Sequence, residues 1–223
     1  MEKGGSPLYY PYVMHHTRPP ARIITVTGSG QIEKEPDFIK IQLEVVTENM
    51  MASAALQENA ERMNRVIEAL QQSGIPKSNI QTTSFTINPR YDYVDGQQIF
   101  RGYTVTNSIS VKVPNGMDAG HIIDTAVQHG VNQISSLQYG IEHENLLYEQ
   151  ALQKALKQAV SKARALAETI QVQLDPKPIK ITEDPAYQPG RPEPLLAVSK
   201  IASTPIEPGQ IVVQASVRVQ FQY

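Results

Sequence analysis

The sequence predicts an α+β protein in which long amphipathic helices pack on a mainly antiparallel sheet. Two observations support this fold class. Several segments alternate apolar and polar residues, as half-buried strands do, whereas others repeat apolar residues every three or four positions, as helices do. In addition, the order strand, helix, strand, strand occurs twice along the chain, so we expect two β-α-β-β-like units.

The first unit is expected to open with two strands and a helix. Residues 22–28 are rich in β-branched side chains and predict a strand. We interpret Gly28-Ser29-Gly30 as a glycine turn between two strands, because a dinucleotide-binding loop would need a helix after it. Residues 38–48 alternate and predict a half-buried strand. Apolar residues in 52–73 recur at helical spacing and predict a helix that ends at Ser73-Gly74.

A long antiparallel hairpin is expected to complete this unit. Residues 79–90 and 99–113 both have the composition of strands, and Asp95-Gly96 between them is a strong turn signal.

The second unit is expected after Pro114. A helix over 117–129 ends at Gly130, and a strand follows over 133–143. The long helix 145–172 has a face rich in alanine, which allows a helix to approach its neighbour closely. The last expected strands are 177–183 and 210–222.

We expect one main domain with two irregular arms. Residues 1–21 contain four prolines and predict a flexible arm, followed by the domain at 22–223 with sub-units at about 22–114 and 115–223. Residues 184–208 hold six prolines, too many for regular structure, and form a second, Pro-rich arm. Its apolar residues favour docking on another surface. The candidate oligomer residues in this arm are Leu195, Leu196, Val198 and Ile201.

Composition excludes several classes of protein. The chain of 223 residues has no cysteine, which removes thiol peroxidases, disulfide scaffolds and Cys-ligated metal sites. Its net charge of -2 argues against binding nucleic acid. No run approaches the ~18 apolar residues of a transmembrane helix. Residues 1–21 lack the apolar core of an export signal, so we expect a cytoplasmic location.

The sequence contains no catalytic constellation. The motifs H-E-x-x-H and G-x-S-x-G do not occur. His143 has no further metal ligands fixed by spacing, and His121 and His129 lie eight residues apart on one predicted helix. We therefore expect no catalytic residue, no cofactor and no metal, and hence a protein that is not an enzyme.

The most distinctive residues surround the tip of the predicted hairpin, at 91–103. Three interpretations are open: cross-strand aromatic pairing that stabilises the hairpin, stacking of a small planar or aromatic ligand beside arginine, and a contact between subunits. The candidate residues are Tyr91, Tyr93, Phe100, Arg101 and Tyr103.

Five segments, in order, resemble the SIMPL domain family over about residues 22–223. They are ITVTGSGQIEKEPDFIKIQLEV (24–45), GIPKSNIQTTSFTINPRYDY (74–93), GYTVTNSISVKV (102–113), YEQALQKALKQAVSKARALAE (148–168) and TPIEPGQIVVQASVRVQFQY (204–223).

The resemblance implies assembly and stress tolerance more than it implies a mechanism. Members of the family include a bacterial oxidative-stress defence protein and a periplasmic immunogenic protein, which is similar to a ring-like, channel-containing homo-oligomer. The family has no agreed catalytic residues to carry over. Many bacterial relatives carry an export signal, whereas here a segment rich in Pro, Tyr and His takes its place, which favours the cytoplasm.

We therefore expect a non-enzymatic protein that assembles with itself, linked to oxidative stress tolerance, with a ring- or channel-like homo-oligomer as its form. The alternative is a binding module for a small planar or aromatic ligand at the hairpin tip.

Overall fold

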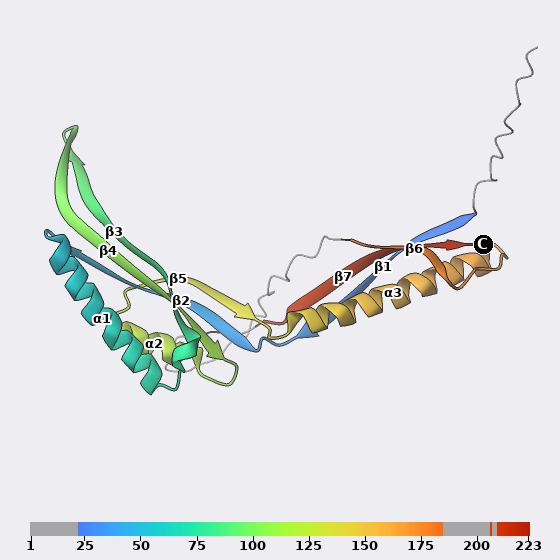
Figure 1. Cartoon of the computed structure of the whole chain (residues 1–223), viewed down its shortest axis with the longest axis horizontal. Coiled ribbons are helices and arrows are strands. Elements are labelled where there is room, and N and C mark those ends of the chain that lie inside the picture. The colour runs from blue at the N-terminus through green and yellow to red at the C-terminus, as the bar shows by residue number, and fades with distance from the viewer. Residues whose placement is uncertain (1–21, 185–205, 207–208) are drawn as a thin grey trace, which may run out of the picture.

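The protein consists of two lobes joined by a narrow waist (Figure 1). The structure, a computed structural model, describes residues 22–184, 206 and 209–223. Every strand pairing among these residues is antiparallel, and helices lie on both sheets, so the α+β fold class is confirmed. Outside the described residues lie the expected arm at 1–21 and the candidate oligomer residues Leu195, Leu196, Val198 and Ile201.

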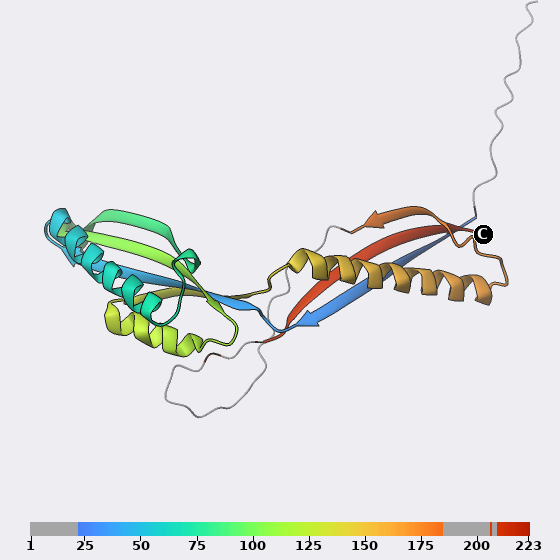
Figure 2. The ribbon, with the colours of Figure 1, turned by 60° about the horizontal axis from the view of Figure 1, so that its bottom comes forward.

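The first lobe is a four-stranded sheet with two helices on one face (Figure 2). The strands follow the order β3-β4-β2-β5 across the sheet, so β3 and β5 are its edges. A short 3₁₀ helix at Lys77–Asn79 precedes β3. The strands and helices of this lobe are β2 (Phe38–Asn49), α1 (Ala52–Gln72), β3 (Ile80–Val94), β4 (Gln97–Pro114), α2 (Ala119–His129) and β5 (Gln133–Gly140).

The second lobe is a three-stranded sheet with one long helix. Its strands follow the order β1-β7-β6, and α3 packs along β1 and β7. The elements are β1 (Ile23–Lys34), α3 (Glu144–Thr169), β6 (Pro178–Glu183) and β7 (Ile211–Gln222).

The sheets divide the chain differently from the sub-units expected at 22–114 and 115–223. β1 pairs with β7 from Ile23↔Gln222 to Lys34↔Ile211, so the two ends of the described chain form one sheet. β5, which follows residue 115, pairs with β2 of the other sheet. The first lobe is thus a continuous segment inserted between β1 and the remainder of the second lobe.

Helix and strand lengths match in one lobe and differ in the other. In the second lobe α3 has 26 residues and spans ~39 Å, close to the ~40 Å of the 12-residue β7. In the first lobe α1 has 21 residues and spans ~32 Å, whereas the 18-residue β4 spans ~60 Å. About half of the β3–β4 hairpin therefore extends beyond the helices that cover its sheet.

The alternation expected for 38–48 is confirmed in β2. Ile39, Ile41, Leu43 and Val45 face the helices and are buried, and each such side chain contributes roughly 1.5–3 kcal/mol. Ile206, a described residue of the expected Pro-rich arm, packs against this core.

The interpretation of Gly28-Ser29-Gly30 as a turn is wrong. Both glycines lie inside the continuous strand β1, where they let α3 approach the backbone. A Cβ on Gly28 would lie 2.0 Å from the carbonyl oxygen of Ala155, and one on Gly30 would lie 2.2 Å from that of Ala151. The alanine-rich face expected for this helix supplies the other side of the contact. Its buried residues are Ala151, Ala155, Ala159, Ala163 and Ala167.

Polar side chains of α3 also close the outer edge of β1. The Nζ of Lys154 donates to the carbonyl of Gln31 (3.1 Å), and that of Lys162 donates to the carbonyl of Thr27 (2.9 Å). Between them Gln158 accepts a hydrogen bond from the backbone N–H of Ser29 (2.8 Å). Three residues one helical turn apart thus bind three alternate backbone groups, which blocks this edge against further strand pairing.

A hydrogen bond flanked by two ion pairs holds the two linkers of the waist together. Asp37 pairs with Lys34 (2.8 Å) and accepts the backbone N–H of Glu142 (2.8 Å). Glu142 in turn pairs with Lys112 of β4 (2.6 Å). The hydrogen bond from Lys34 lowers the pKa of Asp37, and that from Lys112 lowers the pKa of Glu142.

Among the described residues, no helix combines the length and the apolar character needed to cross a membrane.

Gly28→Ala tests the contact between β1 and α3. The new methyl group would overlap the backbone of α3, so we expect the free energy of unfolding to fall by roughly 2 kcal/mol or more. Chemical denaturation measures it. Thr25→Ala, at an exposed position of the same strand, is the matched control, and equal losses in the two variants would contradict this packing.

Lys112→Met tests the electrostatics of the waist. Without the ammonium group, the pKa of Glu142 should rise toward the ordinary range of a glutamate, measured by NMR titration of its carboxyl. Because the folded pKa values of Asp37 and Glu142 are depressed, their contribution to stability is present above the unfolded values and is lost as the pH falls. Lys40→Met should leave the pKa of Glu142 unchanged, and a shift of equal size there would argue against a specific pair.

Candidate functional site

The candidate site is the part of the β3–β4 hairpin that extends beyond the helices. Figure 1 shows this hairpin curving away from α1. Every residue of β3 after Ile80 is exposed, as are the first residues of β4, Gln97 to Arg101. The hairpin tip, expected as a site at 91–103, is therefore on the surface.

Three of the expected aromatic residues form a row across the hairpin. The ring of Phe100 lies 5.6 Å from that of Tyr91 and 5.4 Å from that of Tyr103, in edge-to-face geometry in both cases. Such pairs contribute roughly 0.5–1.5 kcal/mol beyond the area that they bury. The rings are thus engaged with one another and stiffen the hairpin.

The other two expected residues do not join this row. Arg101 pairs through Nε with Asp92 across the strands (2.8 Å), so its charge is engaged within the hairpin. Tyr93, paired with Gln98 near the turn, is 76% exposed. A second ion pair, between Arg90 and Glu48, ties the hairpin to the end of β2.

Two apolar residues of β3 belong to this surface although they were not expected there. Phe85 and Ile87 pair with Asn107 and Val105 and so lie on the helix side of the sheet. They are nevertheless 48% and 41% exposed, since α1 does not reach over β3 at this level. The alternation of side chains along 79–90 indicates that these two residues share one face of the strand. Their exposure could not be predicted from it, because it depends on where α1 lies.

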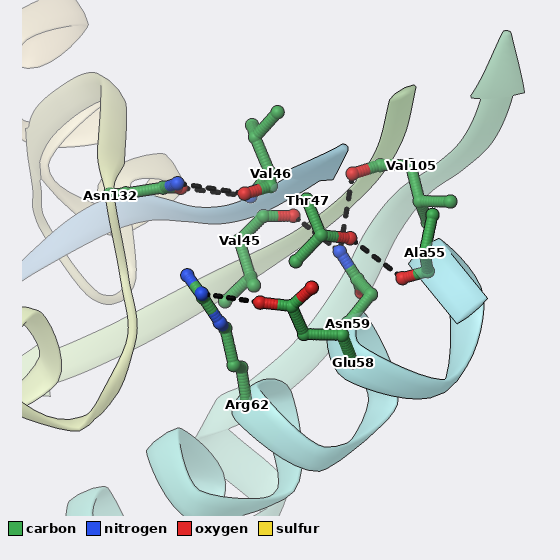
Figure 3. A network of polar contacts seen from close by, with 9 residues as sticks. All are labelled: Val45, Val46, Thr47, Ala55, Glu58, Asn59, Arg62, Val105 and Asn132. Atoms are coloured by element: carbon green, nitrogen blue, oxygen red, sulfur yellow. Dashed lines mark hydrogen bonds and ion pairs between the residues drawn. The ribbon is translucent and has the colours of Figure 1, made fainter. Parts of the chain in front are cut away.

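The base of the hairpin is fixed by a buried asparagine (Figure 3). Asn59 of α1 is completely buried and donates through Nδ2 to the carbonyls of Val45 (2.8 Å) and Val105 (3.2 Å), which belong to β2 and β4. Close by, Thr47 donates to the carbonyl of Ala55 (2.8 Å). These bonds attach the helix to both central strands at the level where the hairpin leaves the lobe.

On the other side of β2, Asn132 replaces a strand residue. Its side chain accepts from the N–H of Val46 and donates to the carbonyl of Val46, both at 2.8 Å. Asn132 directly precedes β5, so its side-chain amide extends the hydrogen-bond ladder between β2 and β5 by one more residue of β2, as Figure 3 shows.

Two buried amide oxygens near this base have no hydrogen-bond partner among the described residues, namely Oδ1 of Asn59 and Oδ1 of Asn107. An unpaired buried acceptor costs roughly 1–3 kcal/mol. For Asn59, this cost offsets part of what its two donated hydrogen bonds contribute.

The three histidines of the described residues are not brought together as a metal site. His121 lies at the start of α2, His129 binds the carbonyl of Thr125 (2.8 Å), and His143 precedes α3 in a left-handed conformation. Within the described part of the chain, no group of three or more His, Cys, Asp or Glu side chains is placed to hold a metal ion.

Three hollows of the described surface lie away from the aromatic row. One of about 370 Å³ is lined by Gln158 and by polar residues of β1 and β7, and one of about 290 Å³ by residues such as Lys180 and Arg218. A third, of about 150 Å³, lies beside Phe38 and Ile206.

The sequence matches known proteins over nearly its full length. The family described as SIMPL, protein of unknown function (DUF541), matches residues 24–221. The "26 kDa periplasmic immunogenic protein" of Brucella melitensis is 31% identical over 219 residues, which cover 92% of this chain and 86% of the relative. A protein of the same name in Brucella abortus is equally similar.

A second relative is "Uncharacterized protein YggE" of Escherichia coli. It is 25% identical over 199 residues, which cover 89% of this chain and 80% of the relative.

These names correct one expectation. The Brucella proteins are named as periplasmic, and this finding overturns the cytoplasmic location expected from residues 1–21.

Asn59→Asp tests the base of the hairpin. The carboxylate cannot donate to the two carbonyls, so we expect a loss of roughly 2–5 kcal/mol at pH 7. Burial raises the folded pKa of the new carboxyl above its unfolded value, so the loss should shrink as the pH falls toward 5 and the group binds a proton. Unfolding curves at both pH values measure this. Asn64→Asp, at an exposed position of the same helix, should cost little at either pH. A pH-independent loss at Asn59→Asp would contradict the assigned bonds.

Proposed function

We propose, from the premise that this chain belongs to the SIMPL family, that it is a self-assembling protein without catalytic activity of its own. The observation that carries the proposal is the uncovered β3–β4 hairpin. Large apolar side chains gather there outside any helix cover, and such an exposed patch is typical of a surface that binds another protein. They are Phe85, Ile87, Tyr91, Tyr93, Val94, Ile99 and Phe100.

The composition of the hairpin favours a protein partner. Aromatic residues and arginine are enriched at the centres of protein interfaces, and the hairpin combines both. The internal ion pairs of Arg90 and Arg101 support this, because they neutralise charge that would otherwise be costly to bury. The hairpin is also stiffened by its aromatic row, which reduces the entropy lost on binding.

The proposed location is the periplasm, in keeping with the names of the Brucella relatives. A chain without cysteine is indifferent to the oxidising conditions of that compartment. The role in oxidative stress tolerance and the ring- or channel-like form that the family resemblance implies are part of the same proposal.

The alternative, a small planar ligand at the hairpin tip, has less support. Tyr91, Phe100 and Tyr103 already pack edge to face, which leaves no parallel faces between which a ring could insert. Arg101 is paired with Asp92. Tyr93 is the aromatic residue of this group best placed to receive a ligand, and one exposed ring makes a weak site.

Light scattering on a sizing column tests self-assembly. We expect the full chain to elute with a mass at least twice that of one chain, and Tyr93→Ser with Val94→Ser to lower that mass by removing apolar area from the contact. Leu146→Ser, in α3, with Ile170→Ser, directly after that helix, removes similarly exposed apolar side chains and should leave the mass unchanged. A wild-type protein that is monomeric at all concentrations would contradict the proposal, as would equal effects of the two double variants.

A further inference from the structure

The edges of the two sheets are treated differently. The outer edge of β1 is occupied by Lys154, Gln158 and Lys162 of α3. The outer edge of β3 has no such cover: along Ser84–Asn88, the described residues supply no hydrogen-bond partner outside β4. In an antiparallel strand, alternate residues point N–H and C=O away from the existing neighbour, so this edge can accept another strand.

β3 is better suited to pairing than the remaining edges. β6 has six residues and carries the charges of Lys180 and Glu183, and β5 has eight residues with a register shift inside it. β3 has 15 residues, and from Ile80 to Pro89 it carries no charged side chain. Natural edge strands are usually protected by charged side chains, proline, bulges or cover, and residues 84–88 of β3 carry none of these.

The regular part of β3 is bounded on both sides. Register shifts against β4 fall between Thr82 and Ser84 and between Pro89 and Tyr91. The undistorted stretch is therefore Ser84–Pro89. Because Pro89 has no N–H to donate, the residues that can pair fully are Ser84–Asn88, and Thr86 is the central one. A partner strand would pair over this stretch.

We propose that the β3 edge binds the same edge of a second copy, antiparallel, about a two-fold axis at Thr86. This inference rests on the proposed self-assembly and names its contact. A second copy fits because a neutral strand meets itself without like charges facing each other. In this register Phe85 of each copy lies opposite Ile87 of the other, so four half-exposed apolar side chains become aromatic–aliphatic cross-strand pairs.

In this register, two unusual residues of β3 also lie opposite each other. Pro89, which has no N–H to donate, lies opposite Thr83, the residue at which the partner strand is bulged. The hydroxyl of Thr83 is turned inward, where it donates to the carbonyl of Ser108 (3.2 Å). The residue that lacks an N–H thus lies opposite the residue that is left out of the regular pairing with β4. The two four-stranded sheets join into one, and both β3 edges are closed.

Disulfide trapping tests the register, because the chain has no cysteine of its own. Residues directly opposite in an antiparallel pair have Cα atoms about 4.5–5.5 Å apart, within the range of a disulfide. Under mild oxidation, Thr86→Cys should give a covalent dimer on a non-reducing gel. Ser84→Cys alone and Asn88→Cys alone should each stay mostly as uncross-linked chains. When the two variants are mixed, a disulfide should form between them, because residues 84 and 88 lie opposite each other in this register. Thr25→Cys, exposed in the other lobe, is the control and should stay single.

A charged side chain at the two-fold axis tests the same contact without a covalent cross-link. Thr86→Lys places two lysines opposite each other and should raise the dissociation constant of the dimer roughly five-fold or more, measured by light scattering over a dilution series. Thr25→Lys should have no effect.

The outcomes separate this inference from the function on which it rests. An oligomeric wild type with no cross-link at Thr86→Cys, or with Ile87→Cys cross-linking in its place, overturns the Thr86 axis and leaves self-assembly standing. A monomeric wild type overturns both.

Discussion

The difference in length between the helices and strands of the first lobe is the constraint on which the rest of the account depends. A helix advances about 1.5 Å per residue and a strand about 3.3 Å, so a 21-residue helix cannot cover an 18-residue strand. The uncovered half of β4 and its partner β3 must form a hairpin that has solvent on both faces. In the second lobe, α3 and β7 have matched lengths, and buried side chains follow β7 along its whole length.

The same contrast governs the sheet edges. Gly28 and Gly30 let α3 lie so close to β1 that lysine and glutamine side chains reach its outer backbone groups. Within the part of the chain that the structure describes, no helix lies close enough to β3 to do this. One lobe is therefore closed by its own helix, whereas the other presents a neutral, apolar edge whose completion needs a further strand. Asn59 anchors the two central strands beside that edge to α1 without covering the edge.

Sequence patterns predicted those features of the fold that depend on residues close together in the chain. The buried face of β2, the alanine face of α3 and the hairpin turn at Asp95-Gly96 follow from spacing and turn chemistry, and all are present. The partners of β1 could not be read in this way, since β7 lies at the other end of the chain. Nor could the role of Gly28, because a glycine that admits a distant helix has the same local signature as one in a turn. The exposure of Phe85 depends on where α1 lies and not on its own strand.

Hydrogen–deuterium exchange at two protein concentrations tests the central claim, that the β3 edge is an interface in solution. The account predicts that backbone amides within 84–88 exchange quickly in dilute protein and slowly in concentrated protein, because pairing protects those that point outward. Amides of β1 should be equally protected at both concentrations, since their edge is already closed within one chain. Fast exchange within 84–88 at both concentrations would contradict the account.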